Sequence, residues 1–287
     1  MVLYCSIYLQ IEALSRLNKL GKQKALLIGK RREIHLNRVT GLKKNHTAEF
    51  NPEDGLLTRN SDFAVVEAYK SIRTNIMYSI PKSESGKVIV LTSAAAGEGK
   101  TTTCINLAMT FAMMNAKVLL IDCDLRKPRI HRYLKLEKKD GLSNVLCGFS
   151  ELHQAIKTNV RDNLDVIIAG DTPPNPAELL QTAEFEKVIT VLKKAYDYII
   201  IDTPPINIVT DATSVIRYSS GVVFLIKKNH TTYDMVDASM EQFKKIGANV
   251  IGSVVVDDRS GNGHSGYKNY KSYKYGYRED ISSKFKK

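Results

Sequence analysis

A strand-like run, a glycine-containing loop and a helix-compatible segment follow one another from Lys87 to Asn115, and this succession constrains the fold most strongly. The run reads KVIVLTS, the loop AAAGEGKTT spans Ala94 to Thr102, and the helical pattern spans Thr101 to Asn115. A strand that enters a Gly-rich turn and continues into a helix presents backbone N–H groups to phosphate. We therefore expect a phosphate-binding loop behind the first strand of an α/β domain.

Five more apolar runs follow the loop: KVLLIDCD, LDVIIAG, YDYIIIDT, GVVFLIKK and NVIGSVVVD. They alternate with helix-like segments such as Ala177 to Lys194 and Tyr233 to Ile246, and a further helix is predicted from Ser61 until Pro81 ends it. Continuous apolar strands between helices indicate parallel strands that are buried on both faces. The predicted fold is α/β, with a mostly parallel sheet covered by helices on both faces.

Positive charge is concentrated at the two ends of the chain. The formal net charge is +12, yet residues 1–45 carry ten Lys or Arg against two glutamates, and residues 259–287 carry eight against two acidic residues. The residues between are nearly neutral, which argues against a basic nucleic-acid-binding domain. We predict a basic extension of unassigned role at 1–50, one domain at 51–258 and a flexible tail at 259–287.

Cysteine use and hydropathy bear on the compartment. Cys5, Cys104, Cys123 and Cys147 form no C-x-x-C pair, so neither a zinc site nor a disulfide framework is predicted. The N-terminal stretch makes a poor signal peptide, and no uninterrupted apolar run approaches the roughly 20 residues of a membrane helix. We expect a cytoplasmic protein that meets a membrane peripherally or through a partner.

The loop has the spacing of a Walker A motif whose first glycine is replaced by Ala94. The fold is thus predicted to be of the P-loop NTPase type with deviant Walker motifs. Lys100 is expected to reach the outer phosphates of a nucleotide, and the Thr101 hydroxyl to face magnesium. The predicted nucleotide-binding residues are Ala96, Gly97, Glu98, Gly99, Lys100, Thr101 and Thr102.

Three aspartates follow two of the predicted strands. Asp122 and Asp124 come after the second strand, and Asp202 after the fourth. Ligands of open α/β sheets bind beyond the carboxyl ends of the strands, so these carboxylates should meet the phosphate loop there. Such a group can hold magnesium and orient or deprotonate an attacking group. The Thr101 hydroxyl and these three carboxylates are the candidate magnesium ligands.

Near its C-terminus the chain reads GYKNYKSYKYGYRED. Its tyrosines are Tyr267, Tyr270, Tyr273, Tyr275 and Tyr277, and their spacing of three, three, two and two fits neither a helix nor a strand. The rings cannot share one buried face, so an exposed tail is predicted. Such a cluster is either a sticky end or a set of substrates for phosphoryl transfer.

Together these motifs resemble the bacterial tyrosine kinases, the P-loop autokinases of capsular and exopolysaccharide biosynthesis, over about residues 61–277. LLIDCDLRKP is similar to the family's modified second Walker motif, IIIDTPP to its Walker B, and GDTPPNPAELL to its proline-rich turn. With no membrane-spanning half, the chain resembles the stand-alone type. The resemblance implies a separate membrane-anchored activator, so that the kinase lies at the inner face of the membrane.

The resemblance also implies ATP and Mg²⁺ as cofactors and assigns roles to the site residues. Lys100 binds phosphates, and Thr101, Asp124 and Asp202 hold magnesium directly or through water. Asp122 and Asp124 shape the position of the attacking tyrosine; Asp122 is favoured as the base, although local chemistry does not separate the two. The tail of one subunit would be phosphorylated in its neighbour's site within a ring-like homo-oligomer. Other tyrosine-containing proteins are expected substrates, and no nucleic acid is.

The chain departs from the family pattern at two places. In the helix implied to form the oligomer interface, Glu67, Lys70 and Arg73 occupy an E-x-x-R-x-x-R pattern, so that Lys70 replaces the first arginine. Lysine keeps the charge but loses the planar donor fork. At the end of the last strand Val256 stands where the family often has an asparagine suited to contact adenine.

Two alternative functions remain open at the level of sequence. A P-loop ATPase that positions the division site or partitions chromosomes would share the fold, but such relatives usually carry a signature lysine where this chain has Ala95. A nucleotide-binding scaffold would assemble without transferring phosphate to tyrosine. The presence or absence of phosphate on the tail discriminates these possibilities from a kinase.

Overall fold

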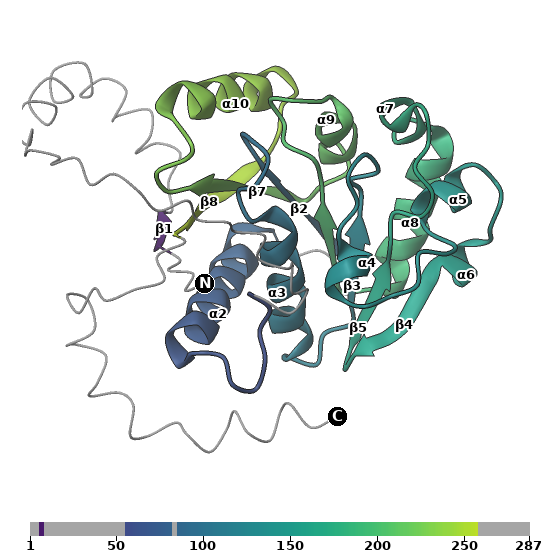
Figure 1. The fold of residues 1–287 in the computed structure, drawn as a ribbon, viewed down its shortest axis with the longest axis horizontal. Helices are drawn as coiled ribbons and strands as arrows, with labels where there is room; N and C mark the ends of the chain where they lie inside the picture. Colours follow the sequence, from purple (N-terminus) through teal and green to yellow (C-terminus); the bar gives the residue numbers. More distant parts are fainter. Residues whose placement is uncertain (1–5, 9–54, 82–84, 258–287) are drawn as a thin grey trace, which may run out of the picture. The chain divides into compact units, whose positions relative to one another are not determined.

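A computed structural model describes residues 6–8, 55–81 and 85–257 (Figure 1). The predicted N-terminal extension, apart from residues 6–8, and the whole predicted tail with its five tyrosines lie outside the described residues.

The described residues form one eight-stranded sheet with the order β1-β8-β7-β2-β6-β3-β5-β4. The strands are β1 (Ser6–Tyr8), β2 (Lys87–Ser93), β3 (Val118–Asp122), β4 (Ile156–Arg161), β5 (Leu164–Ile167), β6 (Tyr198–Asp202), β7 (Gly221–Lys227) and β8 (Val250–Val256). The six strands from β8 to β5 in this order are parallel, and the edge strands β1 and β4 pair antiparallel with β8 and β5. The prediction of a mostly parallel sheet is confirmed.

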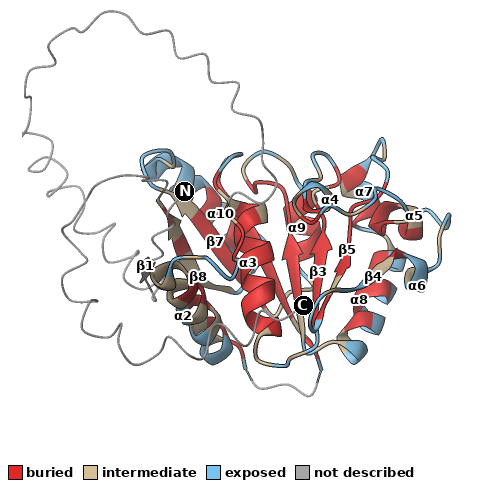
Figure 2. Ribbon diagram, turned by 60° about the horizontal axis from the view of Figure 1, so that its bottom comes forward, coloured by how far each residue is buried: buried red, intermediate tan, exposed pale blue. Residues whose placement is uncertain are grey.

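Helices cover both faces of this sheet, as predicted. They are α2 (Phe63–Ser79), α3 (Lys100–Ala112), α4 (Ile130–Tyr133), α5 (Leu142–Leu146), α6 (Leu152–Ala155), α7 (Pro176–Leu179), α8 (Ala183–Ala195), α9 (Asp211–Ile216) and α10 (Tyr233–Lys245). One apolar cluster joins α2, α3 and α4 to one face, and a second joins α5, α8, α9 and α10 to the other. Figure 2 shows that the central strands and α3 are largely buried.

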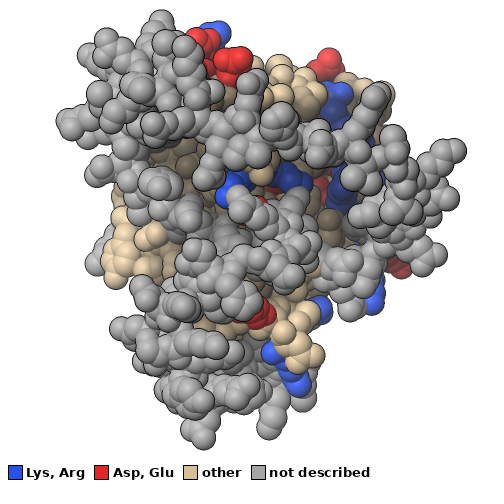
Figure 3. All heavy atoms as spheres, turned by 60° about the vertical axis from the view of Figure 1, so that its left-hand side comes forward, with Lys and Arg blue, Asp and Glu red and all other residues tan. Residues whose placement is uncertain are grey.

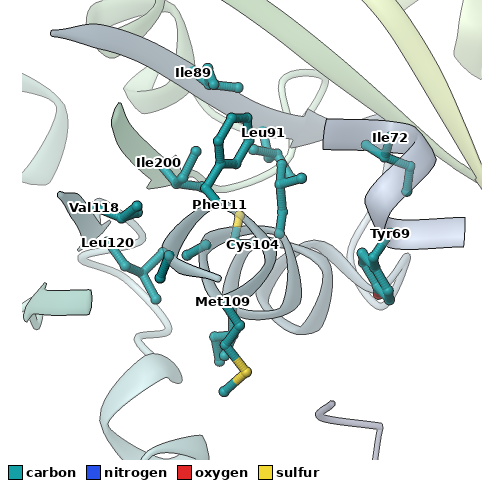
Figure 4. Packing of buried hydrophobic residues seen from close by; sticks show 14 of the residues in the cluster. Tyr69, Ile72, Ile89, Leu91, Cys104, Met109, Phe111, Val118, Leu120 and Ile200 are labelled. Atoms are coloured by element: carbon teal, nitrogen blue, oxygen red, sulfur yellow. The ribbon is translucent and has the colours of Figure 1, made fainter. Parts of the chain in front are cut away.

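Helix α3 carries the phosphate loop at its N-terminus and is buried along most of its length. Figure 4 shows Cys104 and Phe111 of this helix among side chains of β2, β3 and β6, with Tyr69 and Ile72 of α2 on its other side. The Phe111 and Tyr198 ring centroids lie 4.3 Å apart. Since α2 and the sheet enclose α3, the loop at its start is held on a rigid support.

The sequence pattern missed several short elements. The helix predicted from Ala177 to Lys194 is two helices, because the Thr182 side chain caps α8 and accepts a hydrogen bond from the Phe185 N–H. Strand β4 was not predicted, because its half-exposed and polar IKTNVR sequence lacks an apolar run.

On the face shown in Figure 3, the visible charges of the described part have both signs.

Candidate active site

The carboxyl ends of β2, β6 and β3 bring the predicted site together at one edge of the sheet. In the parallel register Asp202 of β6 lies beside Leu91 of β2 on one side and beside Asp122 of β3 on the other. The phosphate loop leaves β2 two residues after Leu91. The three sequence motifs therefore converge as predicted, although they are separated by up to about 100 residues in the chain.

The loop from Ala94 to Gly99 curves over the N-terminus of α3. Its crest, Ala96 and Gly97, is exposed, and Gly97 and Gly99 have φ angles of 79° and 85°. These left-handed conformations suit glycine and strain other residues. A Cβ at Gly99 would lie 3.5 Å from Val256 Cγ1, an ordinary contact, so the φ angle is what requires glycine there. The turn presents the start of a 13-residue helix, whose dipole favours an anion.

Lys100 and Thr101 begin that helix and face two different partners. The largely buried Lys100 ammonium donates to Ser93 Oγ at 3.1 Å, and Ser93 Oγ donates to the Ala95 carbonyl at 2.8 Å. The Thr101 hydroxyl donates to Asp202 Oδ2 at 2.6 Å. A cation and a hydroxyl–carboxylate pair thus lie next to the loop, which fits the predicted roles of these residues.

Asp122 is fully buried, and backbone groups surround its carboxylate. Oδ1 accepts the Asp124 N–H at 3.1 Å, and Oδ2 accepts the N–H groups of Arg129 at 3.2 Å and Ile130 at 3.1 Å. Asp124 is half-buried and accepts the Lys127 N–H at 3.0 Å. The two aspartates differ clearly in environment: Asp122 holds the segment after β3 in place, and Asp124 lies nearer the surface.

Burial perturbs the acidity of two of these carboxyls. Desolvation raises the pKa of Asp202 to about 6, although Lys100 and the Thr101 hydroxyl act in the opposite direction. Desolvation and the neighbouring Asp202 also raise the pKa of Asp122 well above its usual range. Close carboxylates in a dry site compete for ionisation, which is a common feature of sites that bind cations or transfer protons.

Glu98 is the P-loop residue whose contacts sequence analysis did not foresee. It is fully buried, and its Oε2 accepts the Ala95 N–H at 2.8 Å within the loop. Its Oε1 accepts the hydroxyl of Thr231, from the segment between β7 and α10, and lies 3.6 Å from His230 Nδ1. Glu98 therefore joins the loop to a distant segment and does not extend from the loop crest.

Arg126 and Asp211 form a second long-range link at this edge. Arg126 Nε and Nη2 donate to the two Asp211 oxygens at 2.9 and 3.0 Å, and the Asp211 carboxylate is fully buried at the start of α9. This two-pronged geometry ties the segment that follows Asp122 and Asp124 to α9. The partner of Arg126 could not be identified from the sequence, because a single aspartate at the start of a short helix carries no recognisable signal.

The α2 residues of the predicted oligomer interface make contacts within the chain. Lys70 Nζ and Glu67 Oε1 are 2.8 Å apart, and both side chains are about one-third exposed. Arg73 Nη1 donates to the Thr110 carbonyl in the last turn of α3 at 2.6 Å. In the GDTPPNPAELL segment Asn175 is the N-cap residue of α7, without a side-chain capping hydrogen bond, and Pro176 lies in the first turn of that helix.

The donor set fits a nucleotide with magnesium. Positive-φ glycines, a helix N-terminus and Lys100 suit phosphate, while Thr101 and Asp202 offer the oxygen ligands that Mg²⁺ prefers. Within residues 55–81 and 85–257 no group of three or more His, Cys, Asp or Glu side chains is arranged to hold a metal by itself. In the same described ranges, no helix has the length and apolar character to cross a membrane.

Comparison with known proteins gives consistent matches. A family model described as an AAA domain matches residues 86–250. The tyrosine-protein kinase YwqD of Bacillus subtilis is 37% identical over 211 residues, which are 74% of this chain and 85% of YwqD. The tyrosine-protein kinase wzc of Salmonella typhimurium is 35% identical over 84% of this chain, which spans about a third (32%) of its length.

A solved structure agrees with these relatives. The kinase domain of the Escherichia coli tyrosine kinase ETK superposes with a TM-score of 0.66 and 27% identity, over 83% of this chain and 89% of that domain. The similarity therefore covers the P-loop, both strand-end aspartate motifs and the surrounding sheet.

Proposed function

The chain belongs to the bacterial tyrosine kinase family, and we propose that it transfers the γ-phosphoryl group of ATP to tyrosine side chains, including those of its own C-terminal cluster. The observation that carries this proposal is the meeting of the Lys100–Thr101 loop end, Asp202 and Asp122 at one sheet edge. Its relatives YwqD and wzc are named tyrosine-protein kinases.

Positioning and charge stabilisation account for most phosphoryl-transfer catalysis. In the proposed site Lys100 and the loop N–H groups bind the phosphates, while Thr101, Asp202 and Asp124 hold magnesium directly or through water. When bound, Mg²⁺ would neutralise phosphate charge. The phenol oxygen attacks the γ-phosphorus, the bond from that phosphorus to the β–γ bridging oxygen breaks, and ADP leaves with the bond's electron pair.

Asp122 is the proposed acceptor of the phenol proton. A carboxylate has about four acceptor sites, and the three backbone N–H groups that Asp122 binds leave one for a phenol. Burial raises the pKa of this carboxyl, which makes it a stronger base than an exposed aspartate. The phenol is weakly acidic, with a reference pKa near 10, so a positioned base assists the attack.

The proposed substrate is the tail of a neighbouring subunit, with Tyr267, Tyr270, Tyr273, Tyr275 and Tyr277 as acceptors. We propose a ring-like homo-oligomer in which Glu67, Lys70 and Arg73 of α2 contribute to the interface. A membrane-anchored activator would recruit the kinase to the inner face of the membrane. The process regulated would be polymerisation and export of capsular or extracellular polysaccharide.

The test of activity is incubation with ATP and magnesium, with and without an activator segment, followed by detection of phosphotyrosine. Lys100→Met should abolish the signal, because the loop loses its phosphate-binding cation. Asp122→Asn should lower kcat at least about a hundredfold. Asp124→Asn should mainly weaken magnesium binding, so that activity requires a higher magnesium concentration. ATP hydrolysis without phosphotyrosine would instead support a positioning ATPase, and nucleotide binding without either would support a scaffold.

A further inference from the structure

The segment between β7 and α10 makes a series of polar contacts with the phosphate loop. We propose that Glu98 and Thr231 form a clamp that positions this loop for nucleotide, so that Thr231, 133 residues from Glu98 in the chain, determines nucleotide affinity. The inference rests on the proposed function only in taking the loop to bind nucleotide phosphates.

The clamp is a continuous chain of hydrogen bonds. The Lys227 N–H donates to Thr231 Oγ1 at 2.8 Å, the Thr231 hydroxyl donates to Glu98 Oε1, and Glu98 Oε2 accepts the Ala95 N–H at 2.8 Å. It connects the end of β7 to the backbone of the phosphate loop. These hydrogen bonds are partly buried, and successive hydrogen bonds shielded from water polarise and strengthen one another.

Two further contacts join the same segments. Lys227 Nζ donates to the Gly97 carbonyl at 3.2 Å at the crest of the loop. His230 Nδ1 lies 3.6 Å from Glu98 Oε1, too far for a hydrogen bond but within reach of an ion pair when the imidazole is protonated. The loop is therefore held at its crest and at its buried carboxylate by one segment.

A buried carboxylate next to a phosphate site needs an explanation. Glu98 has no exposed surface, and burying a charge is costly unless hydrogen bonds compensate it. Its negative charge also opposes phosphate binding. The presence of Glu98 despite these two costs is explained if its side chain fixes the geometry of the loop. The loop also carries Ala94, Ala95 and Ala96 at positions where such a loop can use the more permissive glycine.

A positioning role and a purely electrostatic role of Glu98 predict opposite changes in phosphate affinity for Glu98→Ala. If charge alone mattered, removal of the carboxylate would tighten binding of a phosphate ligand. If Glu98 positions the loop, its removal frees the Ala95 N–H and the loop backbone, and binding weakens. The sign of the change in ADP affinity therefore separates a positioning role from a purely electrostatic one.

The experiment measures the Kd of ADP with magnesium by isothermal titration calorimetry on the full chain. Glu98→Ala and Thr231→Val should each weaken binding about tenfold, and the double variant by no more than about twentyfold, because both break the same clamp. Thr231→Ser keeps the hydroxyl and should bind within about twofold of the wild type. Thr190→Val on α8, whose hydroxyl donates to the Glu186 carbonyl at 2.8 Å, is the matched control and should leave the Kd unchanged.

Tighter binding by Glu98→Ala, or a double variant weakened about a hundredfold as the product of independent effects, would overturn the clamp. The clamp would also be overturned if Thr231→Ser bound ADP as weakly as Thr231→Val. Thermal unfolding of each variant without nucleotide confirms that the folded protein is being titrated, and Thr231→Val and Thr231→Ser supply the decision if Glu98→Ala does not fold. Because ADP binding is measured, the result does not depend on whether tyrosine is the phosphate acceptor.

Discussion

Removal of Arg126 should show how strongly the segment that bears Asp122 and Asp124 depends on the ion pair between the partly exposed Arg126 and the buried Asp211. The Asp211 side chain has no exposed surface, whereas 43% of the Arg126 side chain is exposed. Removing one partner of a buried pair typically costs about 3–5 kcal/mol, because the other charge remains buried without compensation. Since Arg126 is partly solvated, we expect Arg126→Met to lower the free energy of unfolding by about 2 kcal/mol.

The assay is urea unfolding at neutral pH, with an exposed ion pair as the internal comparison. Lys187 and Glu184 on α8 lie 3.0 Å apart, with 70% and 51% of their side chains exposed. Lys187→Met should therefore cost less than about 0.5 kcal/mol. Adding Asp211→Asn to Arg126→Met removes the unpaired charge and should restore part of the lost stability.

The prediction also has a functional side. The Arg126 pair fixes the segment that bears Asp122 and Asp124, so Arg126→Met should lower phosphotyrosine formation even at temperatures where the variant is folded. Arg126→Lys keeps the charge but lacks the two-pronged donor geometry and should recover only part of the stability. The reasoning fails if Arg126→Met costs no more than Lys187→Met.

Three further predictions concern the same framework. In metal-free buffer, the free energy of unfolding of the wild type should fall relative to that of Asp202→Asn by about 2 kcal/mol between pH 4.5 and 7.5. Burial raises the Asp202 pKa to about 6, and the stability that the protonated carboxyl contributes is lost as pH rises through that value. Urea unfolding that gives the two chains the same dependence of stability on pH would refute this. Gly99→Ala should cost about 1–2 kcal/mol by thermal unfolding, because φ is 85°, and an unchanged Tm would contradict it. Phe111→Ala should cost about 3 kcal/mol in urea, against less than about 0.5 for Phe149→Ala, because Phe111 is fully buried and Phe149 is 81% exposed; equal losses would contradict that.

Much of the fold could be predicted because its central strands are buried on both faces and read as continuous apolar runs. The strand that became β2 matches the predicted KVIVLTS run, and β6 and β7 match their runs within two residues. The edge strand β4 escaped prediction because solvent on one side removes the apolar signal, and a register irregularity between Lys157 and Arg161 interrupts its pairing. Short helices such as α4 contain too few residues for a periodic pattern.

The candidate site likewise has features that the sequence predicted and contacts that it did not predict. Asp122 and Asp202 were predicted to meet because each directly ends a strand, and parallel strands end at one edge. The contacts of Glu98 with Thr231 and of Arg126 with Asp211 join residues 133 and 85 positions apart in loops or at helix ends. No local pattern specifies which loops meet, since tertiary packing of the sheet determines it. The motifs of the candidate site were therefore accessible to sequence analysis, whereas the contacts that hold them in place were not.

The most direct test of the central claim is to mix a chain that lacks a working site with a chain that lacks the tail tyrosines. One chain carries Lys100→Met with an intact tail, and the other has a wild-type site with Tyr267, Tyr270, Tyr273, Tyr275 and Tyr277 all changed to Phe. After incubation with ATP, magnesium and an activator segment, mass spectrometry locates phosphate on each chain. We predict phosphotyrosine on the tail of the Lys100→Met chain only in the mixture. If the wild-type chain phosphorylates its own tail but the mixture yields no phosphotyrosine, transfer between subunits is contradicted. If neither the wild-type chain nor the mixture yields phosphotyrosine, the kinase assignment is contradicted.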